Sequence, residues 1–133
     1  LRPTQGQGAN MIVGVVNTNR EAIIHLIVRG ANGQEHEIEA IVDTGFDGWL
    51  SLPSSVIVQL GLTWLQRGRA LLADGRESVF DIYEATVIWD GQVRRIPVDE
   101  AETTPLVGMS LLDGYELTMQ VRSSGNVIIR ALS

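Results

Sequence analysis

The chain has 133 residues, of which 44% are apolar, and it contains no cysteine. This length and composition predict one folded domain with a sizeable core, and they exclude a disulfide framework and a thiolate metal site. Sixteen acidic and ten basic residues give a net charge of -6. Every basic residue is an arginine, and the arginines are scattered along the chain, so nucleic acid is not an expected partner.

The sequence predicts neither a membrane partner nor a cofactor. No apolar stretch is long enough to span a bilayer, and the first residues lack the apolar core of a signal peptide, so a soluble, cytoplasmic protein is expected. His25 and His36 are isolated histidines, so no metal site is expected. Residues 1–10 are polar and predict a flexible arm, either native or the remnant of a tag before Met11, and residues 11–133 form the predicted domain.

Short apolar stretches rich in β-branched residues predict strands in the first third of the chain. These are residues 11–16, 21–28 and 35–42. Asn32-Gly33 is the strongest hairpin signal and separates the last two. Residues 35–42 alternate between glutamate and mostly apolar side chains, which predicts a strand with one exposed face. This strand ends directly before Asp43.

The rest of the chain continues as strands, close turns and two short helices. The predicted strands are residues 49–52, 69–80 folded at Asp74-Gly75, 81–98 folded at Asp90-Gly91, 105–107, 115–121 and 126–132, and the predicted helices are residues 53–62 and 109–113. This order predicts a single all-β domain with one or two short helices, closed as a barrel or packed as a sandwich.

Two motifs and a hairpin between them resemble a known family. Asp43-Thr44-Gly45 follows an apolar run, the hairpin spans residues 71–76, and Leu106-Val107-Gly108 leads into the second helix. Their order resembles the retropepsin-like aspartic proteases, single-domain relatives of pepsin, and the bacterial and archaeal members more than the viral ones. The resemblance extends from about residue 20 to the end. It implies an acid-protease barrel closed by homodimerisation, with no metal and no organic cofactor.

The chemistry of such an enzyme gives Asp43 a role. Peptide hydrolysis needs a base that activates water and a proton donor for the carbonyl oxygen. Two adjacent carboxylates that share one proton can provide both. The chain has one Asp-Thr-Gly, so this interpretation requires a homodimer with one Asp43 from each subunit and activity at acidic to mildly acidic pH. By the resemblance, Thr44 hydrogen-bonds across the two-fold axis, and Gly45 lets the substrate backbone approach.

Phe46 and Asp47 are candidate substrate-binding residues. Asp47 stands where the viral enzymes hold the main chain of the substrate. In those enzymes an arginine follows the glycine of the second motif, whereas Met109 follows Gly108 here, so Asp47 is either exposed to solvent or paired with another arginine. Phe46 either lines a substrate pocket or packs in the loop and core, and packing is favoured because burying a ring stabilises a chain with few aromatic residues.

Ala73, Asp74 and Gly75 form either a plain hairpin turn or the tip of a flap that closes over the peptide. The position of this hairpin between the two motifs favours the flap. By the resemblance, the apolar C-terminal stretch contributes to the dimer interface. The three tryptophans are expected in the core or in the cleft wall: Trp49, Trp64 and Trp89.

Three functions remain open at this point. The first is a homodimeric aspartic endopeptidase that binds an extended peptide between its subunits. The second is a dimeric peptide-binding module of the same fold with little or no activity, suggested by Phe46 and the missing arginine. The third is a structural β-barrel in which Asp-Thr-Gly is only a turn, which predicts a monomer or a dimer indifferent to Asp43.

Overall fold

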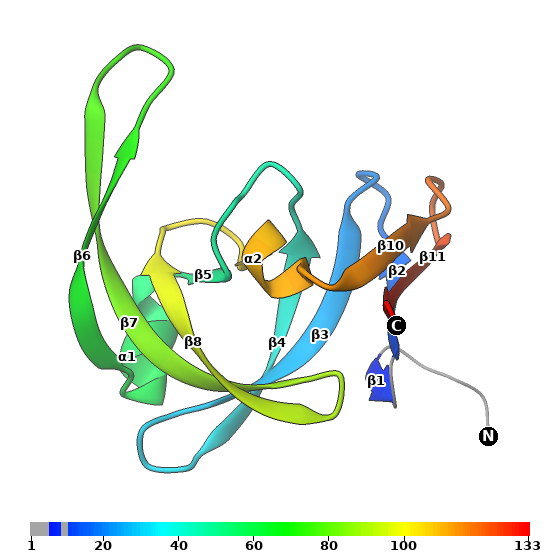
Figure 1. The fold of residues 1–133 in the computed structure, drawn as a ribbon, viewed down its shortest axis with the longest axis horizontal. Helices are drawn as coiled ribbons and strands as arrows, with labels where there is room; N and C mark the ends of the chain where they lie inside the picture. The colour runs from blue at the N-terminus through cyan, green and yellow to red at the C-terminus, as the bar shows by residue number, and fades with distance from the viewer. Residues whose placement is uncertain (1–5, 9–10) are drawn as a thin grey trace.

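A computed structural model describes residues 6–8 and 11–133 of the chain (Figure 1). Most of the expected flexible arm, residues 1–10, lies outside the described residues. Within it, β1 (Gly6–Gly8) pairs antiparallel with the start of β2 (Met11–Val16). The described residues form eleven strands and two short helices, which confirms the all-β expectation.

Six strands close into a barrel. Each is hydrogen-bonded to the next in the order β3, β4, β9, β5, β8, β7, and β7 pairs again with β3 through Ile27↔Ile88 and its two neighbouring pairs. The bounds are β3 (Ala22–Arg29), β4 (Glu35–Val42), β9 (Leu106–Val107), β5 (Leu50–Leu52), β8 (Gln92–Glu100) and β7 (Glu77–Trp89). The pairs β4–β9 and β5–β8 are parallel. The two predicted motif loops therefore lie at one end of the same barrel.

The hairpin of β6 (Thr63–Leu71) and β7 extends beyond the barrel. β7 is one strand of 13 residues, whereas the sequence suggested two separate strands meeting at residues 80 and 81. Its pairing with β8 begins at Ile82↔Asp99. Residues 77–81 pair only with β6 in the described part of the chain. The free part of the hairpin projects away from the body at the upper left of Figure 1.

A second small sheet continues from β2. β11 (Asn126–Ala131) lies between β10 (Tyr115–Met119) and β2 and is antiparallel to both. Both backbone edges of the C-terminal strand are therefore paired within the chain. Among the described elements, no strand covers the outer edge of β10.

Local signals account for the turns and the two helices. The glycines of the predicted Asn-Gly and Asp-Gly turns have positive φ: 83° at Gly33, 85° at Gly75 and 74° at Gly91, as such turns require. α1 (Ser54–Leu60) ends at Gly61, and α2 (Met109–Leu112) follows Gly108 directly. In the described part of the chain, no helix is long and apolar enough to cross a membrane.

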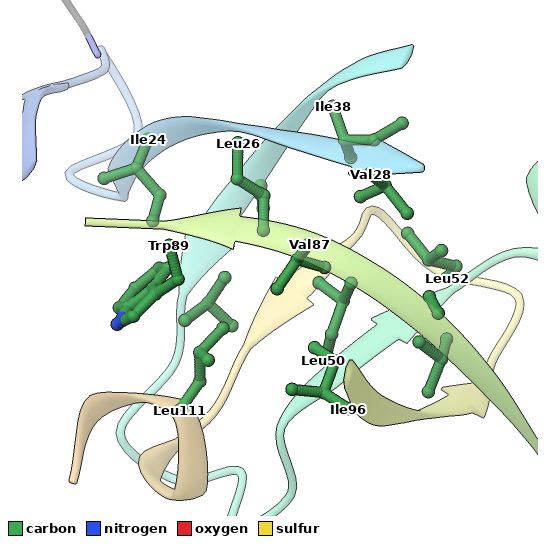
Figure 2. Close-up of a cluster of buried hydrophobic side chains, with 14 of the residues drawn as sticks. Ile24, Leu26, Val28, Ile38, Leu50, Leu52, Val87, Trp89, Ile96 and Leu111 are labelled. Atoms are coloured by element: carbon green, nitrogen blue, oxygen red, sulfur yellow. The ribbon is translucent and has the colours of Figure 1, made fainter. Parts of the chain in front are cut away.

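The core fills the barrel and holds both motif loops in place. Figure 2 shows Trp89 beside Leu111 of α2, with Leu50 and Val87 in the same cluster. All four side chains are fully buried. Full burial of an aliphatic side chain stabilises the fold by about 1.5–3 kcal/mol. The core therefore anchors β5 and α2, the elements that flank the loop after Asp43.

Candidate active site

Asp43 lies where β4 ends and the chain turns toward β5. Its backbone N–H donates to the carbonyl of Val107 at 2.9 Å, which continues the parallel pairing of β4 with β9. Its side-chain Oδ1 accepts the N–H of Gly45 at 2.9 Å, and its carbonyl accepts the N–H of Phe46 at 3.2 Å. The Asp43 side chain is half-buried, whereas Thr44 and Gly45 are exposed. The two motifs are thus in direct contact, and the carboxylate is held by its own turn.

The start of α2 is hydrogen-bonded to the loop that follows Asp43. The carbonyls of residues 46–49 each accept one hydrogen bond, at 2.6–3.0 Å, from the N–H groups of Gly108, Met109 and Ser110 and from the Ser110 hydroxyl. A Cβ atom added to Gly108 would lie 2.3 Å from the Gly48 carbonyl oxygen. Glycine is therefore required at residue 108 because the two backbones touch there.

A cleft of about 880 Å³ lies beside this loop. Its walls come from the loop itself, from the stem of the β6–β7 hairpin and from the end of β8 with the segment after it. The lining residues are 45–47, 69–71, 78–80 and 99–101 with Ser51, Thr103 and Leu106. Among the predicted site residues, Gly45, Phe46, Asp47 and Leu106 line the cleft. Asp43 and Thr44 precede it directly in the chain without lining it.

Phe46 combines the two roles that the sequence offered as alternatives. Its ring lies within 2.6 Å of the point where a Cβ on Gly48 would be, and within 2.7 Å of the corresponding point on Gly108. The ring thus packs on its own loop, as favoured, and also forms part of the cleft wall.

A structure comparison identifies the fold. No protein-family model matches the sequence, and no curated protein is significantly similar to it. The structure is similar to the crystal structure of a retropepsin-like aspartic protease from Rickettsia conorii, with 99% of each chain covered, a TM-score of 0.59 and 18% sequence identity. The chain has the retropepsin fold. At this identity the similarity defines the fold alone, and activity has to be argued from the site.

In this retropepsin fold, Ala73, Asp74 and Gly75 form the exposed tip of the β6–β7 hairpin. The Arg76 N–H donates to Asp74 Oδ1 at 3.0 Å, and Arg76 Nε donates to Oδ2 at 2.6 Å. Both bonds hold the pKa of Asp74 below its ordinary value, and the bond from the backbone N–H has the larger effect. The turn is confirmed. The cleft is lined by the stem of the hairpin and not by this tip, so a contact of the tip with substrate stays a prediction.

Asp99 is a cleft residue that sequence reasoning missed. It lies on β8 opposite Ser51 of β5 and is half-buried. Burial and, second, the negative charge of Asp47 raise the pKa of Asp99 above its ordinary value. Asp47 itself is exposed and forms no ion pair within the described residues. No local signal marks Asp99, because the parallel pairing that brings it to the cleft joins distant parts of the chain.

The three tryptophans differ from one another. Trp89 is fully buried, and Trp49 packs against the core with the Arg94 guanidinium 5.3 Å from its ring centre. The expectation of core or cleft wall is wrong for Trp64, which is 52% exposed and donates its ring N–H to Asp81. Trp64 lies on β6, the edge strand of the described sheet, where most side chains are exposed. In residues 6–8 and 11–133, no cluster of three or more acidic or histidine side chains could hold a metal ion.

Proposed function

We propose that the protein is an aspartic endopeptidase that hydrolyses extended peptides as a homodimer. The observation that carries the proposal is the junction of the two motifs. The Asp43 N–H is bonded to Val107, and the carboxylate is fixed by Gly45 next to a cleft of peptide-binding size. A plain turn would need neither the second motif nor the cleft.

Catalysis requires two carboxylates. One Asp43 would act as base toward the attacking water, and the other, carrying the shared proton, would protonate the carbonyl oxygen of the peptide. One chain supplies one Asp-Thr-Gly. The exposed Thr44 and Gly45 leave this turn accessible to a second copy of the chain. The active unit is therefore a two-fold symmetric dimer.

The arrangement of the C-terminal strand limits how the dimer can form. Both backbone edges of β11 are paired, to β10 and to β2. The partner subunit cannot add a strand to β11, so the interface expected from the C-terminal stretch uses a face of this small sheet or the outer edge of β10.

The peptide would lie in the cleft between the loop after Asp43 and the stem of the β6–β7 hairpin. An extended peptide forms strand-like backbone bonds with such walls. The hairpin would act as a flap that excludes water from the reacting bond. Phe46 on the loop and Phe80 on the hairpin, the two phenylalanines of the chain, both line this cleft and would contact apolar side chains of the substrate.

The test compares wild type with Asp43→Asn on a diverse peptide library at several pH values. Both proteins are used at the same concentration, after sedimentation has established that both are dimers. We expect cleavage by wild type alone, strongest below neutral pH, because the shared proton must be retained on the Asp43 pair.

Three results would contradict the proposal. Cleavage that survives in Asp43→Asn would mean that another group or a contaminant hydrolyses the peptides. The absence of cleavage by a confirmed wild-type dimer, combined with peptide binding, would identify the peptide-binding module instead. A monomer that neither cleaves nor binds peptides would support the third interpretation, a structural β-barrel in which Asp-Thr-Gly is only a turn.

A further inference from the structure

The cleft carries an uneven distribution of charge. Its apolar surface includes Phe46 and Phe80, and the carboxylate residues Asp47, Asp99 and Glu100 also line it, the last two at the end of β8. Arg69 also lines the cleft, but its guanidinium is bonded to Glu77 at 2.9 Å and is largely exposed. The cleft is therefore negative where β8 ends.

Asp99 lies beside an aromatic ring. Its Oδ2 atom is 3.3 Å from the point where a Cβ on Gly48 would be, and the Phe46 ring atom Cζ is 2.5 Å from the same point. Because Gly48 has no side chain, the ring and the carboxylate are close neighbours in the cleft. A ring next to a carboxylate suits a side chain with an apolar stem and a positive end.

Among residues 6–8 and 11–133, no group compensates the charge of Asp99. Within the described residues its carboxylate takes part in no hydrogen bond and no ion pair. A half-buried ionised carboxylate without a partner is unfavourable, because it has lost part of its hydration and has no hydrogen bond or cation to replace it. The direction of its pKa shift agrees with this position. A cation delivered by a ligand would remove the penalty.

We propose that Asp99, with Asp47 beside it, selects peptides that carry an arginine or lysine side chain at the position bound between the Phe46 ring and the end of β8. This inference rests on the proposed function, since it assumes that the cleft receives a peptide. A charge-assisted bond from a guanidinium or ammonium group to a carboxylate is stronger than one between neutral groups. The alkyl stem of the same side chain would pack against the Phe46 ring.

The experiment uses pairs of peptides that differ at one position, with arginine in one and its neutral analogue citrulline in the other. The pairs are built around bonds that the wild type cleaves, with the substituted position moved along the peptide. The kcat/KM ratio of arginine to citrulline is measured for wild type, Asp99→Asn, Asp99→Glu and the control Glu37→Gln. Glu37→Gln makes the same change in net charge as Asp99→Asn. Glu37 is exposed on β4 and lies outside the cleft, so its substitution leaves the cleft unchanged.

At one position of the peptide, we expect wild type to prefer arginine by about tenfold or more, as a bond between charged groups implies. Asp99→Asn should lose most of this preference, Asp99→Glu should retain part of it, and Glu37→Gln should keep it in full. Equal cleavage of both peptides by wild type at every position, or a preference that survives in Asp99→Asn, would overturn the inference.

The two proposals can fail separately. If wild type cleaves peptides without a preference for arginine, the endopeptidase stands and the role of Asp99 is wrong. If wild type cleaves nothing, the endopeptidase proposal fails, and arginine and citrulline pairs of peptides from the same library are then measured for binding by fluorescence anisotropy. Tighter binding of the arginine peptide that is lost in Asp99→Asn would still support the inference, and equal binding would reject it.

Discussion

Gly108→Ala is the substitution with the clearest expected consequence for the site. A methyl group at this residue would lie 2.3 Å from the Gly48 carbonyl oxygen and 2.8 Å from that of Phe46. Carbon and oxygen atoms in favourable contact are about 3.3–3.6 Å apart. The start of α2 and the loop after Asp43 must therefore separate by roughly 1 Å to accept the methyl group.

The hydrogen bonds between α2 and the loop set the size of the effect. Four of them, at 2.6–3.0 Å, join residues 108–110 to the carbonyls of residues 46–49, and a separation of this size would stretch several of them beyond bonding distance. Each such bond stabilises a protein by about 1 kcal/mol net. We expect Gly108→Ala to lower the free energy of unfolding by about 2–4 kcal/mol, a large fraction of the usual 5–15 kcal/mol.

Urea denaturation at one fixed protein concentration measures this change, because the stability of a dimer depends on concentration. Gly33→Ala is the control. Gly33 has a φ of 83° and nothing within 4 Å of an added Cβ, so only backbone strain of about 1 kcal/mol is expected there. A Gly108→Ala protein as stable as the wild type, or no less stable than Gly33→Ala, would refute the close contact between the two backbones.

Three further changes test other parts of the structure. Since burial raises the pKa of Asp99 above its ordinary value of 3.8, the folded state binds this proton more tightly, and the ionised group destabilises the fold above that raised pKa. Asp99→Asn should be more stable than wild type at neutral pH in thermal unfolding, with the difference disappearing as the pH falls through the raised pKa to below 3.8. Tyr115→Phe removes the hydroxyl that donates to buried Asp90 at 3.1 Å, and a loss of about 1–3 kcal/mol is expected by urea denaturation. Gly68→Val would displace the Phe80 ring, which lies 2.7 Å from an added Cβ, and should weaken peptide binding by fluorescence anisotropy more than it lowers the melting temperature.

Local signals in the sequence predicted the turns and most of the strands. Gly33, Gly75 and Gly91 lie at tight turns because only glycine adopts their positive φ without strain. The alternation in residues 35–42 located the exposed face of β4. Asp43 was predicted as a site residue because its motif is contiguous in the chain.

Long-range pairing explains what the sequence did not reveal. Asp99 reaches the cleft through the parallel pairing of β5 with β8, in which it pairs with Ser51, a residue far away in the sequence. Nothing in the residues around Asp99 encodes that partner. The continuity of β7 was missed for a similar reason, since its first part pairs with β6 and its last part with β8 and β3. No periodicity in residues 77–89 distinguishes one strand with two sets of neighbours from two strands.

The uninterrupted course of β7 also determines how the hairpin can move. From Glu77 to Asp81, β6 is the one described strand that pairs with β7, and a two-stranded ribbon is weakly stabilised by itself. From Ile82 onward β8 joins it, and at its far end Trp89 is fixed in the core. Bending should therefore concentrate at Ile82, with amide exchange fast toward the tip and slow toward Trp89. Asp99 lines the cleft and pairs with Ile82 at this point, so a ligand that contacts Asp99 would lie beside the root of the hairpin.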